Sequence, residues 1–222
     1  MVLLAWLLPT VWSPTIIALA LTLWSSGEAG IRCEIRRLSY SRGSSQWLVV
    51  ASVFPVLTTA IAVFSARAVG DSAPFTPPDA IPTMVVMQIV TGAVGEEPGW
   101  RGFLLPRLEK RIGKMMGAWL MAILWSLWHV AGMMFPGMPL QIVPPVLFLL
   151  SVAFFGIFLA FVFNRTGGSV LATIFAHLSF NIALGAAGVR LSSPVFWWVV
   201  VGIYGASAVL ITIASPISPP GE

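Results

Sequence analysis

Four ionisable side chains lie within apolar stretches of this sequence, where they carry a high energetic cost. Glu96 and Glu97 are adjacent, and His129 and His177 are the only two histidines of the chain. Asn181 follows His177 by four residues, so on a helix these two side chains share one face. Ionisable groups inside a membrane segment mark a functional site by default. We therefore expect these side chains to form a site.

The residue types of this set suit the activation of a water molecule. A carboxylate such as Glu96 in a pocket of low dielectric can act as a general base. An imidazole, here His129, can orient the same water. His177 and Asn181 together offer hydrogen-bond donors to a developing oxyanion. Arg101 follows Glu97 by four residues, and we expect the two to pair.

Other roles remain open for the same residues. Glu96, His129 and His177 could instead bind a divalent metal such as Zn²⁺, with water in the open position; the sequence leaves open whether the cofactor is Zn²⁺ or none. Either histidine could be an interhelical polar contact, and Asn181 could serve helix packing alone. Glu97 with Arg101 could be a structural ion pair. The single cysteine excludes a thiolate zinc site and an internal disulfide.

The composition shows which solvent surrounds the elements that position these residues. Of the 222 residues 58% are hydrophobic and 9% charged, with a mean hydropathy of +0.93. A soluble domain carries about 25% charged residues. These values exclude a soluble domain, a disordered chain, a disulfide-stapled module and a nucleic-acid binder, despite a pI near 10.0.

Seven apolar runs are candidates for membrane-spanning helices, each of which needs about 20 residues. We therefore expect an all-α polytopic membrane protein of about seven transmembrane helices, the first of them retained and not cleaved as a signal peptide. A short amphipathic helix between Arg101 and Lys114 is expected on the cytoplasmic face. The runs are at residues 2–24, 47–66, 83–97, 117–135, 142–163, 168–188 and 194–214.

The positions of the basic residues predict the orientation of the chain in the membrane. Alternate connections carry ten of the twelve, and only Arg67 and Arg190 lie on the other side. By the positive-inside rule the N-terminus is outside and the C-terminus cytoplasmic, in what we expect to be a prokaryotic plasma membrane. The ten are Arg32, Arg36, Arg37 and Arg42, then Arg101, Arg107, Lys110, Arg111 and Lys114, and finally Arg165.

Three short motifs resemble those of a known family. The segment Glu96-Glu97-Pro-Gly-Trp-Arg101 resembles the EExxxR signature of the CAAX-protease and bacteriocin-processing (CPBP or Abi) family of intramembrane proteases. His129 stands where the second motif, FxxxH, ends, and His177 to Asn181 matches the third, HxxxN. Trp125 is a departure, because the family usually has Phe there; we expect this change to affect the shape of the pocket more than its chemistry.

The resemblance covers residues 83–188, which we take as the catalytic core. Residues 1–82 hold two further transmembrane helices, and residues 189–222 the last helix and a tail. The resemblance implies hydrolysis of a peptide bond in a membrane-associated substrate, either a prenylated CAAX-type protein or a leader peptide. Relatives include bacteriocin maturation and self-immunity proteins.

The resemblance also implies a role for each site residue. Glu96 would be the general base and His129 would hold the same water. His177 and Asn181 would stabilise the oxyanion, supported by Glu97 with Arg101. Both a metalloprotease and a metal-free glutamate mechanism are compatible with this set.

We expect membrane lipid and a membrane-tethered peptide or protein as partners, no nucleic acid, and a water-filled cavity reached from the cytoplasmic side. Two alternatives remain. One is a small proton- or ion-coupled transporter, although no internal repeat supports it. The other is a non-catalytic membrane partner of the bacteriocin-immunity type.

Overall fold

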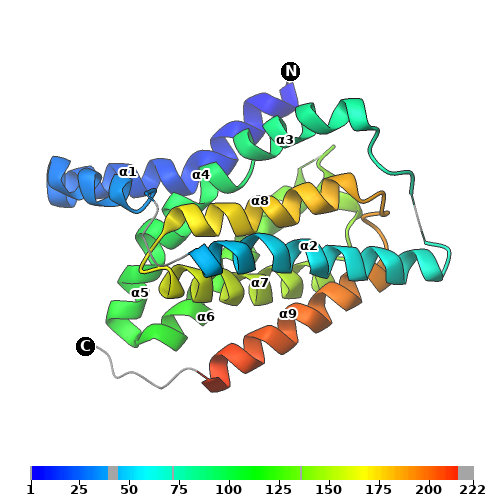
Figure 1. Cartoon of the computed structure of the whole chain (residues 1–222). Coiled ribbons are helices and arrows are strands. Elements are labelled where there is room, and N and C mark those ends of the chain that lie inside the picture. Colours follow the sequence, from blue (N-terminus) through cyan, green and yellow to red (C-terminus); the bar gives the residue numbers. More distant parts are fainter. Residues whose placement is uncertain (1, 40–44, 72, 136, 215–222) are drawn as a thin grey trace.

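A computed structural model describes residues 2–39, 45–71, 73–135 and 137–214. Its described residues form helices and connections without a β-strand, as Figure 1 shows. The all-α prediction is confirmed. The helices are α1 (Val2–Arg36), α2 (Ser45–Ala68), α3 (Ile81–Val90), α4 (Ala93–Glu97), α5 (Leu105–Ile112), α6 (Lys114–Met134), α7 (Pro145–Arg165), α8 (Val170–Ala186) and α9 (Pro194–Ala214).

Five helices are long and apolar enough to cross a membrane: α1 from Leu8 onward, α2, α6, α7 and α9. Helix α8 is apolar but shorter than these five. The polytopic membrane class is thus supported, whereas the expected number of seven spans is not established.

The expected third span, residues 83–97, is interrupted. Helix α3 ends at Val90 and α4 begins at Ala93, and a π-helical turn, Pro98–Leu104, follows α4 directly. Proline lacks the N–H that an α-helix would use at this point. Pro98 therefore begins a wider turn, of a kind often found at functional sites. The expectation of one continuous helix was wrong here.

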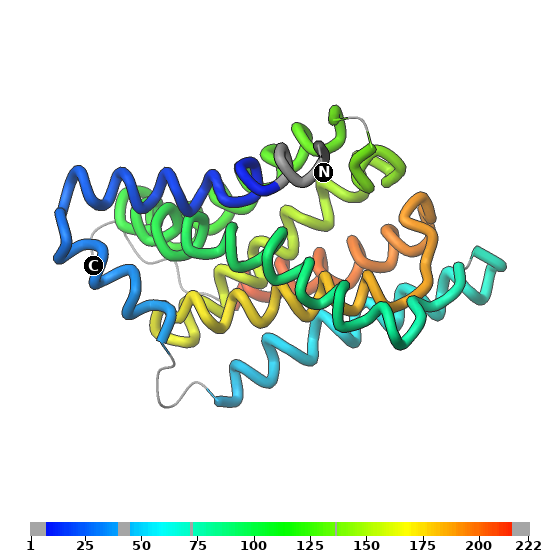
Figure 2. The backbone as a smooth tube through the Cα atoms, turned by 90° about the horizontal axis from the view of Figure 1, so that it is seen from above, coloured from blue at the N-terminus to red at the C-terminus, as the bar shows by residue number. Residues whose placement is uncertain are grey.

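The first helix differs from the expected span 2–24 because it continues to Arg36. It bends at Gly27, whose φ of +58° lies in the left-handed region that glycine adopts without steric cost. Figure 2 shows the two straight parts of α1 running in different directions. The residues after the bend bring Glu34 and Arg37 towards the π-helical turn.

The expected amphipathic helix is present as α5, with Leu105 buried and Arg107 and Lys110 exposed. It is joined to α6 by Gly113 alone, so the chain reverses sharply between the two helices (Figure 1).

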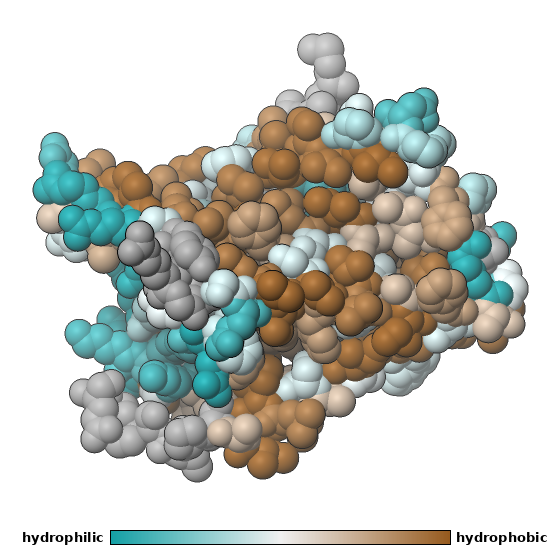
Figure 3. Space-filling view, viewed as in Figure 1, coloured by the Kyte–Doolittle hydropathy of each residue, from teal (hydrophilic) through white to brown (hydrophobic). Residues whose placement is uncertain are grey.

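Basic residues gather at one end of the molecule, which we call the basic end. Figure 3 shows hydrophilic residues at this end and a broad hydrophobic band across the middle. Contacts join its segments: Glu34 lies 3.6 Å from Arg107, and the amide of Asn164 donates to Glu109 at 2.6 Å. The basic end comprises Arg32, Arg36, Arg37, Arg107, Lys110, Arg111, Lys114 and Arg165.

The opposite end, which we call the loop end, is formed by the connections at residues 69–71, 73–80, 137–144 and 187–193. Here the guanidinium of Arg67 donates to the carbonyls of Ala73 and Gly188 at 3.0 and 3.2 Å. Thr76 donates to the carbonyl of Gly185. The connection after α2 is therefore tied to the end of α8.

The core lies around α7, which is apolar on all sides and is the most buried of the long helices. An aromatic cluster fills the space between α7 and its neighbours α2, α8 and α9, and its Phe155 and Phe180 also line the candidate site. The cluster contains Phe54, Phe155, Phe158, Phe180 and Tyr204.

Candidate active site

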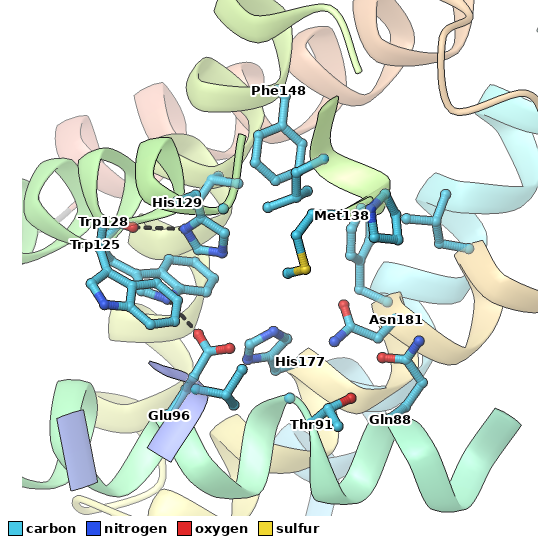
Figure 4. Close-up of a pocket in the computed structure, with 18 of the residues that line it drawn as sticks. Gln88, Thr91, Glu96, Trp125, Trp128, His129, Met138, Phe148, His177 and Asn181 are labelled. Carbon is cyan, nitrogen blue, oxygen red and sulfur yellow. Dashed lines mark hydrogen bonds between the residues drawn. The ribbon is translucent and has the colours of Figure 1, made fainter. Parts of the chain in front are cut away.

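A cavity of about 360 Å³ lies between α1, α3, α4, α6, α7 and α8. Four of the predicted site residues line it: Glu96, His129, His177 and Asn181. Figure 4 shows their side chains pointing into the same space from three separate segments of the chain, α4, α6 and α8. The sequence spacing alone places no two of these segments next to each other.

Glu96 lies at the deep end of the cavity and is 5% exposed. Its Oε2 accepts a hydrogen bond from the indole N–H of Trp125 at 2.8 Å. The second carboxylate oxygen points towards His177 and the cavity (Figure 4). One oxygen is thus held by the protein while the other faces the space where a substrate would bind.

His129 is oriented by the backbone of its own helix. Its Nδ1 lies 2.8 Å from the carbonyl oxygen of Trp125. A carbonyl can only accept, so Nδ1 carries the proton and donates it. In the neutral ring Nε2 is then an acceptor, and it is directed to the cavity (Figure 4).

A buried charged trio supports His177 from behind. Glu97 Oε1 accepts from the guanidinium of Arg101 at 3.0 Å and from Nδ1 of His177 at 2.8 Å. The side chains of Glu97 and Arg101 are fully buried, and neither lines the cavity. The predicted Glu97–Arg101 pair is present, with His177 as a third member. Breaking a buried pair of this kind leaves an uncompensated charge.

Trp125 contacts Glu96, Arg101 and both histidines of the site. Besides its hydrogen bond to Glu96, its ring lies 4.0 Å from the guanidinium carbon of Arg101. Its ring centroid is 5.2 Å from that of His129 and 5.3 Å from that of His177. We expected Trp in place of Phe to affect the shape of the pocket more than its chemistry, but the indole N–H that bonds Glu96 is a donor that Phe lacks.

Three polar residues line the cavity that sequence reasoning missed: Thr10, Gln88 and Thr91. Gln88 lies in the last turn of α3 and Thr91 in the break between α3 and α4, an interruption that the hydropathy pattern does not show. The same break brings position 92 close to α8: a Cβ atom there would lie 3.1 Å from Nδ2 of Asn181.

The residues of the alternative metal site share the cavity but are not gathered into one ligand group. Across the part of the chain that the structure describes, no three His, Cys, Asp or Glu side chains gather as a metal-binding group. Glu96, His129 and His177 share the cavity, but one oxygen of Glu96 is already taken by Trp125. Each imidazole donates through Nδ1 to a protein acceptor, which leaves Nε2 for a water or substrate atom.

The cavity extends towards the loop end. A second cavity, of about 460 Å³, adjoins it and shares Gln88, Phe148 and Asn181 with it. The second cavity reaches Pro74 and Val189 in the loop-end connections. The access from the cytoplasmic side that the sequence predicts stays a prediction; the structure shows only that the two cavities extend towards the loop end.

Comparison with known proteins gives one match. Residues 78–183 match the model of the family described as type II CAAX prenyl endopeptidase Rce1-like. No curated protein matches the chain. The matched segment begins just before α3 and ends within α8, so it contains Glu96, His129, His177 and Asn181.

Proposed function

Because residues 78–183 match the model of the type II CAAX prenyl endopeptidase Rce1-like family, we propose that the chain is an intramembrane endopeptidase of this family in which Glu96 activates water. The observation that carries the proposal is the convergence of Glu96, His129, His177 and Asn181 on one cavity. A general base, a water-orienting imidazole and oxyanion donors are the groups that peptide hydrolysis requires.

In the first step, water attacks the scissile carbonyl carbon. Glu96 takes a proton from the water through its cavity-facing oxygen, while Nε2 of His129 accepts a hydrogen bond from the same water and fixes its direction. The new C–O bond gives a tetrahedral intermediate with a negative oxygen. Glu96 then returns its proton to the leaving amine as the C–N bond breaks.

The negative oxygen is stabilised from α8. The amide of Asn181 is a donor at any pH. His177 becomes a second donor when its Nε2 is protonated, and Glu97 stabilises that imidazolium through Nδ1. Arg101 keeps Glu97 ionised, so these two residues position His177 and do not touch the substrate.

We propose a metal-free reaction, because among the residues that the structure describes no three metal-ligating side chains gather in one group. The substrate is proposed to be a membrane-associated peptide, since the remaining cavity lining, including Val11, Leu140 and Phe148, is largely apolar. Membrane lipid surrounds the apolar outer faces of the helices.

Cleavage of a membrane-tethered reporter peptide by the purified protein in detergent tests this proposal. Glu96→Gln keeps the size of the side chain and its acceptor for Trp125 but removes the base, so we expect cleavage to fall about a hundredfold or more. Glu28→Gln is the matched control, because Glu28 is exposed far from the cavity.

Full activity of the Glu96→Gln protein would show that Glu96 is not the base. Wild-type activity should also persist after exhaustive chelation with no metal bound. Activity that is lost on chelation and restored by Zn²⁺ would overturn the metal-free mechanism while leaving the peptidase assignment in place.

A further inference from the structure

The first cavity extends along two helices, α6 and α8, in the same direction. Along α6 the lining passes from Trp125 through His129 to Gly132, and along α8 it passes from His177 to Leu184. Both helices run from the basic end to the loop end (Figure 1). Glu96 therefore lies at the closed end of the cavity, and its wider part extends away from the basic residues.

The loop end is where this space reaches the surface. The second cavity continues the first past Asn181 and is lined by Pro74, Val189 and Leu191 of the loop-end connections. Pro74 is exposed. A chain that enters beside Pro74 would pass from the second cavity to the first along the lining residues that the two share, among them Asn181 and Leu184.

Hydrogen bonds of the bent end of α1 close the basic end of the molecule. The guanidinium of Arg37 donates to the carbonyl of Gly102 at 2.7 Å, and the N–H of Val170 donates to the carbonyl of Arg37 at 2.8 Å. Gly102 and Val170 are buried. The bent end of α1 thus binds both the π-helical turn and the start of α8, and no residue of this seal lines either cavity.

The two ends of the molecule also differ in charge. The basic end carries eight described Lys or Arg residues, against Arg67 and Arg190 near the loop end. Lys- and Arg-rich connections stay in the cytoplasm. The mouth of the cavity then faces the other side of the membrane.

We propose that the substrate is an apolar peptide segment whose cleavage site lies in the non-cytoplasmic half of the membrane and enters beside Pro74. This inference rests on the proposed function. Beyond Glu96, His129 and His177 the lining of the first cavity holds no charged side chain, so it suits an uncharged segment, such as that of an exported or membrane-anchored peptide. A lipid-modified C-terminus presented from the cytoplasm would meet the end closed by Arg37.

Cysteine labelling in intact bacterial cells tests the orientation without reference to activity. The native Cys33 is exposed and lies beside the basic residues of α1. A membrane-impermeant maleimide should label wild-type protein only after lysis, whereas Pro74→Cys in a Cys33→Ala background should be labelled in intact cells. Labelling of Cys33 in intact cells and of Pro74→Cys only after lysis would overturn the proposal.

Entry is tested with two reporters that carry the same cleavage sequence, in the outer or the inner half of one apolar span. We expect cleavage of the outer reporter, and loss of that cleavage when Pro74→Cys is labelled with a bulky maleimide. Asp79→Cys, exposed at the same end but outside both cavities, is the matched control and should keep its activity after labelling.

These outcomes separate the two proposals. Cleavage of the inner reporter alone would overturn entry from the loop end while supporting the peptidase. Cleavage of neither reporter by correctly oriented protein would count against the proposed function itself.

Discussion

At the scale of single residues, the site depends on the hydrogen bond from the indole N–H of Trp125 to Glu96, which a phenylalanine at position 125 could not make. Trp125 holds Oε2 of Glu96 through its indole N–H, and its backbone carbonyl fixes the tautomer of His129. The orientation of the proposed base and of the water-holding imidazole therefore both come from one residue. A phenylalanine here would keep the aromatic packing and the carbonyl but not the donor.

Trp125→Phe should lower kcat of the peptidase by about tenfold or more, because a hydrogen bond to a charged group contributes about 1.5–3 kcal/mol. KM should change little, since the cavity walls stay in place. Trp119→Phe is the matched control: Trp119 lies on the same helix and donates to Thr212 at 3.2 Å, away from the cavity. Equal losses in the two variants would indicate a structural role only.

The buried trio predicts a loss of stability as well as of activity. Glu97→Gln removes the ion-pair partner of the buried guanidinium of Arg101, and we expect the free energy of unfolding to fall by about 3–5 kcal/mol. Thermal unfolding in detergent measures this. Glu28→Gln breaks an exposed pair with Arg32 and should change stability by less than about 1 kcal/mol. A stable Glu97→Gln protein would show that Arg101 is solvated or paired elsewhere.

At the scale of elements, the site is assembled around an interrupted segment. The break between α3 and α4 and the π-helical turn after Glu97 place Glu96 against α6 and Glu97 against α8. Helix α1 crosses this region so closely that position 99 admits only glycine: a Cβ atom there would lie 2.3 Å from the backbone carbonyl carbon of Pro14.

Gly99→Ala should therefore push α1 away from the π-helical turn and destabilise the protein by about 1–3 kcal/mol. Gly202→Ala on α9 is the control, because an added Cβ there meets no atom within 4 Å. In that helix interior alanine should stabilise by up to about 1 kcal/mol. Unfolding midpoints of the two variants, measured side by side in one detergent, test the argument; equal midpoints would contradict it.

At the scale of the whole molecule, the sequence predicts the helical class and the site residues better than the course of the backbone that connects those residues. Glu96, His129, His177 and Asn181 stand out because they are polar residues in apolar runs. The interruption at Gly92 could not be predicted, because hydropathy averages over a span and contains no information about backbone geometry. The direction in which the cavity extends could not be predicted either, since it depends on how α6, α8 and the loop-end connections pack around it.

The hydrophobic band across the middle of the molecule in Figure 3 predicts how the protein responds to a charge introduced there. Leu57 lies midway along α2 with a side chain that is 54% exposed. On a water-exposed surface Leu57→Arg would change stability by less than about 0.5 kcal/mol. At the centre of a membrane span an arginine costs about 2.5–3.5 kcal/mol. We therefore expect Leu57→Arg to reduce the amount of protein recovered in the membrane fraction.

Val69→Arg is the control for this experiment, because Val69 is 65% exposed and follows the end of α2 directly. A long basic side chain there can reach the polar interface, so the recovery should match that of the wild type. Equal recovery of both variants would mean that the exposed face of α2 does not contact lipid. The contrast between two exposed apolar positions twelve residues apart thus tests whether the band is solvated by the bilayer, on which the placement of the candidate site depends.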